Sequence, residues 1–510
     1  MSTFTCARAR ARAAARLLLV CALALAAAAG CSDSGSSTPD AGVDGARDVV
    51  TPDAPDTDGA VVTAREKQDF EALMTFAQQH IASVKAPGAA IAVLLRGKLA
   101  FARGVGVKRE GQNDPVSETT LFSLASLSKV ITAATALSLV EDGTVTLQDS
   151  ADKHLPAIKL APPSDAAKVT LEMLLSHTSG ITNIAPTTLG NVGLDFDSPD
   201  VLAKAFEAVD WPMWAPPGAV WNYSNRGYSL AGAMLARAAS KPFAELVKAR
   251  VFDVLSMSGA TLSEADAAKA DHTAGHGASQ AGGPIEPGSQ FVTGYLDEPN
   301  DGVYASVTDV ARFCEALLGD GGAMLPKARV DQLTARAVDL ADQLDGYGYG
   351  FGLYRIERGG KVQLEHSGGN QGWSANVVLV PDEGFAVVAL VNHAGGQPWV
   401  LTSRAHELFA KTLDRPKPFT RLTVAELEKL AGSYTDASGR LGKITLATNG
   451  KDGQLSATLG NNAPTVMAQN GPYFFSVVVP GIGGVTVQVY RDSAGQGEYL
   501  VTRVGVAKRD

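Results

Sequence analysis

Two segments near opposite ends of a long helical region have the pattern of β-hairpins. Residues 89–105 and 374–391 each contain two apolar runs separated by a short turn sequence, Arg-Gly in the first and Pro-Asp-Glu-Gly in the second. Such runs around short turns predict paired strands. Helical spacing of apolar residues lies between the two segments, and residues 70–84 add one more such pattern before them. Strands at both ends with helices between predict an α/β (α+β) fold, with one antiparallel sheet closed by its terminal strands and covered by helices.

The last ninety or so residues have a different pattern. Residues 423–430 have helical spacing, and short β-rich runs follow at 443–447, 454–459, 473–479, 485–490 and 499–506. Asn-Gly and Asp-Gly turn signals separate the first of these runs. We therefore predict a domain over residues 64–413 and a small all-β barrel or sandwich over residues 421–510, with no catalytic set of residues in the second.

Residues 1–30 have the organisation of a secretory signal. Four arginines precede an apolar stretch over residues 17–28, which is short for a membrane span. The stretch ends in Ala-Ala-Gly before Cys31 and resembles a bacterial lipoprotein box, which implies a lipid on the Cys31 thiol; simple secretion is the alternative. Residues 31–63 are rich in Ser, Pro and Asp and predict a flexible acidic linker. We expect an exported protein of the cell envelope, lipid-anchored in the periplasm or at the outer membrane.

Charge and cysteine content exclude several classes of protein. The net charge of −9 does not suit a nucleic-acid partner, because phosphate binding needs a basic surface. Beyond Cys31 the chain has only Cys314, so no internal disulfide can form between the predicted domains. His272 and His276 lie in a glycine-rich stretch without the spacing of a zinc site. We expect no metal and no cofactor.

Ser126 and Lys129 form the first candidate catalytic pair. At this spacing on a helix the two side chains share one face, so the amine can reach the hydroxyl. A serine becomes a nucleophile when a nearby base takes its proton, and lysine is such a base when its pKa is lowered. Ser150 and Lys153 have the same spacing but lie in a polar stretch, which predicts a surface position.

Tyr223, Ser224 and Asn225 form the second candidate motif. The tyrosine hydroxyl can relay a proton to a leaving group, and the asparagine amide can orient the lysine and the substrate. The motif occurs once in the chain. A buried tyrosine beside a turn asparagine is the alternative if the motif is taken alone.

His366 opens the third motif, which continues through Gly368 and Gly369 at the entry to a predicted strand. Small residues there let a substrate lie along the strand edge, and a backbone N–H can face a carbonyl oxygen. His393 has the same spacing to a glycine but follows a strand. We therefore favour His366.

Together the three motifs resemble the serine β-lactamase and penicillin-binding superfamily, in its class C-like branch. That branch includes D-Ala-D-Ala carboxypeptidases, D-aminopeptidases and β-lactamase-like esterases. Flanking residues 122–129, 174–180 and 346–352 agree with the family's pattern, and the resemblance covers about residues 65–412. The segment 421–510 is similar to a lipocalin-like domain appended to such hydrolases.

The resemblance implies a role for each motif residue. Ser126 is the implied nucleophile, Lys129 and Tyr223 share the general-base and proton-relay work, and Asn225 orients them. Which of Lys129, Tyr223 or the substrate itself is the base stays open.

The family also implies how the substrate is held. The N–H groups of Ser126 and Gly369 form the implied oxyanion hole, and Gly368 lines the substrate path. His177 lies in another family signature, which we interpret as structural. Class C β-lactamases have a lysine where this chain has His366, and a neutral imidazole holds a substrate carboxylate less strongly than an ammonium. This difference disfavours efficient antibiotic hydrolysis.

The sequence thus predicts an exported serine hydrolase that cleaves an ester or an amide through an acyl-enzyme at Ser126. Esterase and D-amino-acid peptidase activities are equally favoured; a β-lactamase proper and a non-catalytic envelope-binding module are alternatives. The expected substrate is a small molecule or a peptide, such as a fragment of peptidoglycan. No Gly-x-Ser-x-Gly sequence occurs after residue 30, which excludes the α/β-hydrolase pattern. The oligomeric state is not predicted.

Overall fold

The computed structural model describes residues 61–510, except for 162–164, 187, 190–191, 195–197, 199, 278–282, 288–294, 437–440, 450–452, 480–482 and 504. The predicted leader, Cys31 and the linker up to residue 60 lie outside the described residues. Among the described helices, none has the length and hydropathy needed to cross a membrane.

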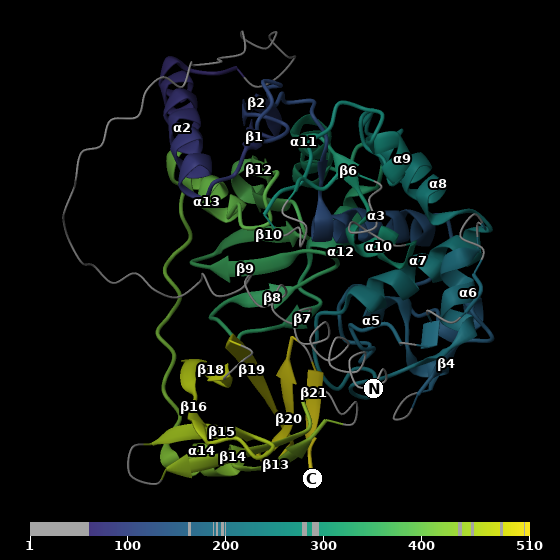
Figure 1. Ribbon diagram of the computed structural model, residues 1–510, viewed down its shortest axis with the longest axis vertical. Coiled ribbons are helices and arrows are strands. Elements are labelled where there is room, and N and C mark those ends of the chain that lie inside the picture. Colours follow the sequence, from purple (N-terminus) through teal and green to yellow (C-terminus); the bar gives the residue numbers. More distant parts are fainter. Residues whose placement is uncertain are drawn as a thin grey trace, which may run out of the picture.

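An antiparallel sheet of eight strands forms the centre of the first part of the chain, in the order β2-β1-β12-β11-β10-β9-β8-β7 (Figure 1). Its strands are β1 Gly88–Leu95, β2 Lys98–Gly106, β7 Val338–Asp339, β8 Tyr347–Tyr349, β9 Tyr354–Arg358, β10 Lys361–Gly369, β11 Ser374–Val380 and β12 Phe385–Val391. The first strand pairs with the last, Ala90 opposite Leu390. The predicted sheet closed by its terminal strands is therefore confirmed.

Both faces of this sheet are buried, because successive side chains of a strand point to opposite faces. Ala92 and Val388 face the large core, whereas Ile91 and Val387 face a second, smaller core. The second core lies under two helices, α2 Ala64–Ser83 and α13 Pro398–Phe409, which cover that face of the sheet (Figure 1).

Helices on the other face form the large core and carry the candidate site. The helices and short turns of this layer are η1 Ala125–Leu127, α3 Ser128–Glu141, α4 Ala151–His154, α5 Leu171–Leu175, α6 Val201–Ala208, α7 Asn225–Ala239, α8 Phe243–Val247, α9 Glu264–Ala267, α10 Glu298–Asp301, α11 Val307–Leu318 and α12 Lys327–Thr334. Two small sheets have two strands each. In one, β3 Phe122–Ser123 pairs with β6 Tyr304–Ala305, and in the other, β4 Lys159–Leu160 pairs with β5 Asp210–Trp211. Helix α3 is nearly all buried, which explains its apolar sequence.

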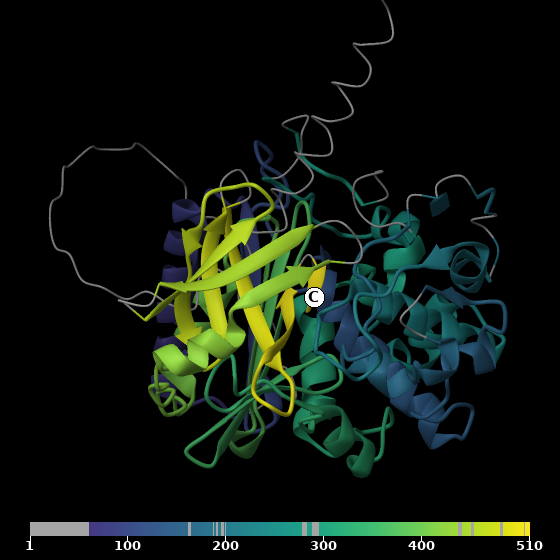
Figure 2. The ribbon, with the colours of Figure 1, turned by 90° about the horizontal axis from the view of Figure 1, so that it is seen from below.

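The C-terminal segment forms a nearly closed, barrel-like antiparallel sheet of nine strands, in the order β16-β15-β14-β13-β21-β20-β19-β18-β17 (Figure 2). Helix α14 Val424–Leu430 precedes β13 Gly432–Thr435, β14 Lys443–Asn449, β15 Gln454–Leu459, β16 Thr465–Val466, β17 Ala468–Gly471, β18 Phe474–Val479, β19 Gly483–Arg491, β20 Gly497–Thr502 and β21 Gly505–Arg509. The predicted barrel or sandwich is thus confirmed in its all-β character. The resemblance to lipocalins stays a prediction.

The single predicted strand over residues 499–506 is wrong. The chain turns between β20 and β21, and these two strands pair with Thr502 opposite Gly505. The turn contains Arg503 but no residue of the usual turn set before Gly505, so the run has the composition of a continuous strand.

The two sheets meet next to the candidate site. Tyr490 and Tyr499 of the C-terminal sheet pack with Trp214 and Val220 of the first part in one apolar cluster. The hydroxyl of Tyr490 accepts a hydrogen bond from the backbone N–H of Trp221 at 3.1 Å and is 3.3 Å from the carbonyl oxygen of the same residue. The C-terminal sheet is therefore docked on the segment that leads into the tyrosine motif.

Candidate active site

Ser126 lies in the short 3-10 helix η1, immediately before helix α3 begins at Ser128. We predicted that Ser126 and Lys129 lie on one helix. Ser126 instead lies in the 3-10 turn that precedes the helix, although the spacing to Lys129 is preserved. Ala125, just before the serine, has a φ of 48°, a left-handed conformation that is strained for a residue with a Cβ. The turn leaves Ser126 partly exposed at the start of a helix whose other residues are largely buried.

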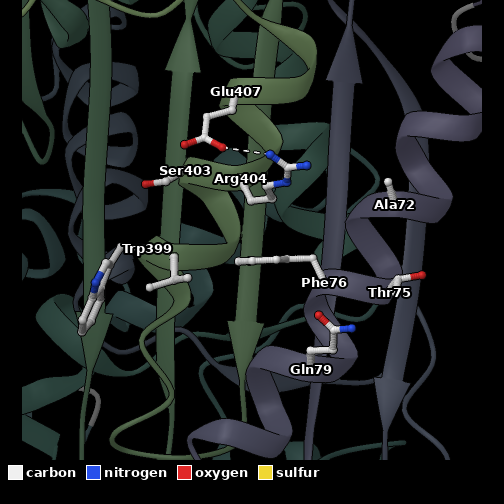
Figure 3. Close-up of a pocket in the computed structure, with 9 residues that line it drawn as sticks. Ala72, Thr75, Phe76, Gln79, Trp399, Ser403, Arg404 and Glu407 are labelled. Carbon is white, nitrogen blue, oxygen red and sulfur yellow. Dashed lines mark hydrogen bonds and ion pairs between the residues drawn. The ribbon is translucent and has the colours of Figure 1, made fainter. Parts of the chain in front are cut away.

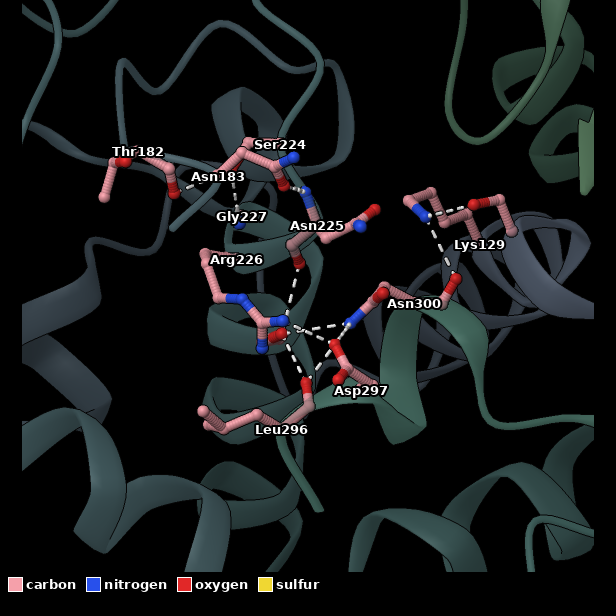
Figure 4. A network of polar contacts seen from close by, with 12 residues as sticks. Lys129, Thr182, Asn183, Ser224, Asn225, Arg226, Gly227, Leu296, Asp297 and Asn300 are labelled. Carbon is pink, nitrogen blue, oxygen red and sulfur yellow. Dashed lines mark hydrogen bonds and ion pairs between the residues drawn. The ribbon is translucent and has the colours of Figure 1, made fainter. Parts of the chain in front are cut away.

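The side chains of Ser126 and Lys129 are in contact, as the motif predicts. The Lys129 Nζ lies 3.1 Å from the Ser126 Oγ and 2.9 Å from the carbonyl oxygen of Asn300 (Figure 4). Lys129 is 0% exposed. Burial lowers the pKa of Lys129 to about 7, and the nearby carboxylates of Asp301 and Asp297 oppose this effect. A large fraction of the amine is therefore neutral near pH 7, and a neutral amine can accept a proton.

Asn300 is a site residue that the sequence analysis missed. It lies in the short helix α10, and its side-chain amide bonds Ser229 Oγ at 3.1 Å and Leu296 O at 3.2 Å. These bonds fix the carbonyl that faces Lys129 (Figure 4). No local pattern identifies Asn300, because its partners come from helix α7 and from the preceding turn.

The tyrosine motif lies at the beginning of helix α7. Ser224 caps this helix, since its Oγ accepts a hydrogen bond from the N–H of Gly227 at 3.0 Å. Asn183 accepts from the N–H of Asn225 at 2.6 Å. In Figure 4 the side chains of Asn225 and Lys129 point toward one another. The Asn225 Oδ1 has no hydrogen-bond partner among the described residues.

Tyr223 lies beside both the serine and the lysine. Its ring centroid is 4.9 Å from the Lys129 Nζ, and its hydroxyl is hydrogen-bonded to Ser126. Burial raises the pKa of the Tyr223 hydroxyl, against the opposing effect of the Ser126 hydrogen bond. Tyr223 is therefore a neutral phenol at neutral pH, suited to pass a proton on rather than to act as a free tyrosinate.

The His177 ring packs against the Tyr223 ring. Its Nδ1 accepts a hydrogen bond from the Ser224 N–H at 3.1 Å, so the ring proton is on Nε2, 3.2 Å from the Tyr349 hydroxyl. The His177 ring lies 4.4 Å from the Tyr223 ring, centroid to centroid. Burial holds the pKa of His177 well below its usual value. This neutral, enclosed ring agrees with the structural role that the sequence analysis assigned to it.

His366 lies within β10 rather than at the opening of a strand, and this detail of the prediction is wrong. The imidazole is 2% exposed, and burial lowers its pKa to about 3, so the ring is neutral. Its Nδ1 donates to the Ser367 carbonyl oxygen at 2.7 Å. The Nε2 is therefore an acceptor, and it has no hydrogen-bond partner among the described residues. This nitrogen offers a carboxylate neither a positive charge nor a proton.

The end of β10 is close to the turn that contains Ser126. Residues 361–365 pair with β9, whereas residues 366–369 pair only with β11, which leaves one backbone edge unpaired by β9. A Cβ on Gly368 would lie 2.1 Å from the Leu124 carbonyl oxygen, so only glycine fits there. A Cβ on Gly369 would meet nothing within 4 Å. The free strand edge predicted for this motif is therefore present beside Ser126.

The alternative motif residues lie elsewhere. Ser150 Oγ bonds the Asp152 carboxylate at 2.5 Å, and Lys153 Nζ bonds Asp149 at 2.7 Å, so this serine and lysine engage other partners. His393 contacts the glycine that follows it in the chain, with the Gly395 N–H donating to its Nδ1 at 3.0 Å.

The two histidines considered for a metal also have partners within the protein. His276 donates from Nδ1 to the Asn392 carbonyl oxygen, and its Nε2 accepts from the Glu110 N–H. The Nε2 of His272 lies 3.2 Å from the Glu286 carboxylate. Among the described residues, no cluster of three or more potential metal ligands occurs.

A groove of about 740 Å³ opens between helices α2 and α13 (Figure 3). These helices cover the face of the sheet opposite to the large core, to which Leu124 and Leu127 on either side of Ser126 belong. Phe76 and Trp399 line it, together with an Arg404–Glu407 ion pair of 3.0 Å. It contains none of the residues predicted for catalysis.

Comparison with known proteins identifies the family. Residues 70–411 match the family model described as Beta-lactamase. This match covers well over half of the chain, and the chain therefore belongs to the beta-lactamase family.

Proteins with several different names are similar to this chain in sequence. Penicillin-binding protein 4 of Amycolatopsis lactamdurans is 27% identical over 74% of this chain and 98% of that protein. Esterase EstB of Burkholderia gladioli is 28% identical over 52% of this chain and 74% of that protein. A D-aminopeptidase of Gluconobacter oxydans is 26% identical over 60% of this chain and 56% of that protein.

Solved structures share the fold. The crystal structure of SurE superimposes with a TM-score of 0.67 at 21% identity, covering 87% of this chain and 100% of that one. The octameric penicillin-binding protein homologue from Pyrococcus abyssi has a TM-score of 0.59 at 22% identity, covering 86% of this chain and 100% of that one.

Proposed function

We propose that this protein is a serine hydrolase that cleaves an ester or an amide through an acyl-enzyme at Ser126. The observation that carries the proposal is the 3.1 Å contact between the Ser126 Oγ and a fully buried Lys129 amine, whose pKa burial lowers toward neutrality. A base of this kind, within hydrogen-bond reach of a hydroxyl, is what nucleophilic catalysis by serine requires.

The proposed reaction has two halves. The neutral Lys129 amine takes the Ser126 proton while the Oγ attacks the substrate carbonyl carbon, and the N–H groups of Ser126 and Gly369 stabilise the oxyanion. Tyr223 donates its phenolic proton to the leaving group, which departs as the tetrahedral intermediate collapses, and the proton held by Lys129 replaces it. Water then attacks the acyl carbon and gives a proton to the same groups. They return this proton to the Ser126 Oγ as the acyl–oxygen bond breaks and a carboxylic acid is released.

The proposed substrates are D-amino-acid peptides or carboxylic esters. Support comes from relatives named as penicillin-binding protein, esterase and D-aminopeptidase, each under 30% identical to this chain. β-Lactam hydrolysis is the less favoured activity, because the neutral, buried His366 stands where class C β-lactamases have a lysine. We also propose export, with a lipid on Cys31, from the leader-like sequence of residues 1–31.

A fluorescent fluorophosphonate tests the proposal on the purified protein. We expect covalent labelling of the native chain and its loss in Ser126→Ala, with labelling retained in Ser150→Ala. No labelling of the native protein over the pH range 6–9 would favour a non-catalytic binding module instead. Parallel assays with a short-chain aryl ester and a D-Ala-D-Ala peptide then separate esterase from peptidase activity.

A further inference from the structure

The turn between β20 and β21 brings a cation to the candidate site from a part of the chain far away in sequence. The carbonyl oxygen of Thr502 accepts a hydrogen bond from the Asn222 side chain at 3.0 Å. Asn222 directly precedes Tyr223, and Arg503 directly follows Thr502. One hydrogen bond therefore ties the residue before the candidate tyrosine to the residue before this arginine.

Additional contacts hold this turn in place. Tyr490 of the neighbouring strand β19 bonds the Trp221 backbone, and Val501 and Val506 on either side of the turn pack against Trp214 and Val220. An arginine next to an anchored turn has a restricted range of positions, which lowers the entropy lost when it binds a ligand.

Arg503 is the exposed residue of this turn that carries a charge. Its side chain is exposed, and no ion pair or hydrogen bond to it occurs among the described residues. Its charge nevertheless acts on the site, since it lowers the pKa values of Lys129, Tyr223 and Tyr354. An unpaired guanidinium at this position is available to bind an anionic group of a ligand held at Ser126.

The side chains next to Ser126 are poor partners for a substrate carboxylate. The Nε2 of His366 is a neutral acceptor that does not attract a carboxylate. Lys129 is fully buried and contacts the Asn300 carbonyl oxygen and the Ser126 hydroxyl, and burial lowers its pKa to about 7, so it is a weaker cation than an ordinary lysine. A substrate carboxylate at this site would therefore need a cation from another element.

We propose that Arg503, presented by the C-terminal sheet, binds a carboxylate on the leaving-group side of the substrate and so makes the enzyme selective for anionic leaving groups. The inference rests on the proposed acyl-enzyme function and names one feature of its substrates. Arg503 is in this account a specificity-determining residue and takes no part in proton transfer.

Two aryl esters with the same acyl group test this proposal on the purified full chain. One has a m-carboxyphenol leaving group and the other the neutral m-carbamoylphenol. We expect the native protein to have the higher kcat/KM for the carboxylate ester. Arg503→Gln should lower kcat/KM for that ester about tenfold to hundredfold, the range for one charge-assisted contact, and change the neutral ester less than about twofold. Arg503→Lys should restore part of the preference.

The matched control is Arg421→Gln, which removes an exposed arginine from the linker before α14. This variant should keep the native preference. An unchanged ratio of the two esters in Arg503→Gln, or no preference in the native protein, would overturn the role of Arg503 while leaving Ser126 turnover intact. Failure of the native protein to hydrolyse either ester, together with absent fluorophosphonate labelling, would overturn the proposed function itself.

A pH profile separates binding from a merely structural effect. Because the positive charge of Arg503 lowers the pKa of Lys129, its removal should move the acid limb of kcat/KM for the neutral ester to higher pH. Arg503→Lys, which keeps the positive charge, should leave this limb in place.

Discussion

The chain contains the same Ser-x-x-Lys spacing twice, and the two copies differ in every physical respect that matters for catalysis. At Ser126 the lysine is 0% exposed and lies 3.1 Å from the serine hydroxyl. At Ser150 the Lys153 side chain is 56% exposed and pairs with Asp149, while the serine bonds Asp152. The second copy precedes the four-residue helix α4.

The comparison shows that burial, rather than spacing, turns a lysine into a base. Desolvation destabilises the charged amine at Lys129 and lowers its pKa, whereas Lys153 remains largely in water beside a carboxylate. The burial of Lys129 comes from segments distant in sequence: α10 provides the Asn300 carbonyl oxygen, and the turn before α7 provides the Tyr223 ring.

Removal of each serine should give the largest difference between the copies. Ser126→Ala should reduce ester hydrolysis by about a thousandfold or more, because the nucleophile is lost. Ser150→Ala should stay within about twofold of the native rate. Steady-state kinetics with an aryl ester provide the measurement, and an equal loss in both variants would break the comparison.

Removal of each lysine should have the next largest effect. Lys129→Met keeps a long side chain but removes the amine that acts as the base. We therefore expect kcat to fall by about 10²- to 10⁴-fold. Lys153→Met should leave kcat unchanged. Circular dichroism establishes that both variants are folded. Full activity in Lys129→Met would exclude this lysine as the base.

Two neighbouring glycines test how closely the turn containing Ser126 is held. Gly368→Ala forces a Cβ against the Leu124 carbonyl oxygen, and the resulting shift of the turn should cost about 1–3 kcal/mol of stability and about 100-fold in kcat/KM. Gly369→Ala, where a Cβ meets nothing within 4 Å, should be folded as stably as the native protein. Chemical denaturation and ester kinetics measure the two effects. Equal stability of both variants would contradict the close approach of β10.

The pH dependence of acylation sharpens the comparison further. Below its pKa of about 7 the Lys129 amine is protonated and cannot accept the Ser126 proton, so kcat/KM should rise with pH and level off above that value. A lysine with the usual pKa of 10.5 would give a rise that continues into alkaline pH. A pH–rate profile between 5 and 10, with a neutral ester, distinguishes these outcomes.

The smallest expected effect is the change in the protein's free energy of unfolding when Lys153 of the second copy is replaced. Lys153→Met removes an ion pair whose lysine is mostly exposed, and the free energy of unfolding should change by less than about 1 kcal/mol. Urea denaturation of the purified variant measures it. A loss of several kcal/mol would mean that Lys153 is held much more firmly than its exposure indicates.

Local sequence patterns predicted the terminal hairpins and the Ser126–Lys129 pair, because these features depend on short-range spacing. The sheet order, with β1 beside β12, followed from the position of the strand patterns along the chain. The motif residues Ser126, Lys129 and Tyr223 were found because catalysis needs those chemical groups at recognisable intervals.

Other parts of the site depend on contacts that leave no local pattern. Asn300 and His177 act through partners in other elements, and nothing in their own surroundings predicts those partners. The turn at Arg503 was missed because β-branched and apolar residues surround it and make two short strands resemble one. For the same reason the sequence did not predict that the C-terminal sheet contacts the segment before Tyr223.

We expect the substrate to acylate Ser126 and not Ser150. Acid quenching of an aryl-ester reaction, followed by intact mass measurement and peptide mapping, tests it directly. We expect a mass increase equal to the acyl group, located on the peptide that contains Ser126 and absent in Ser126→Ala. Turnover without any acyl adduct on Ser126, or an adduct on Ser150, would contradict it.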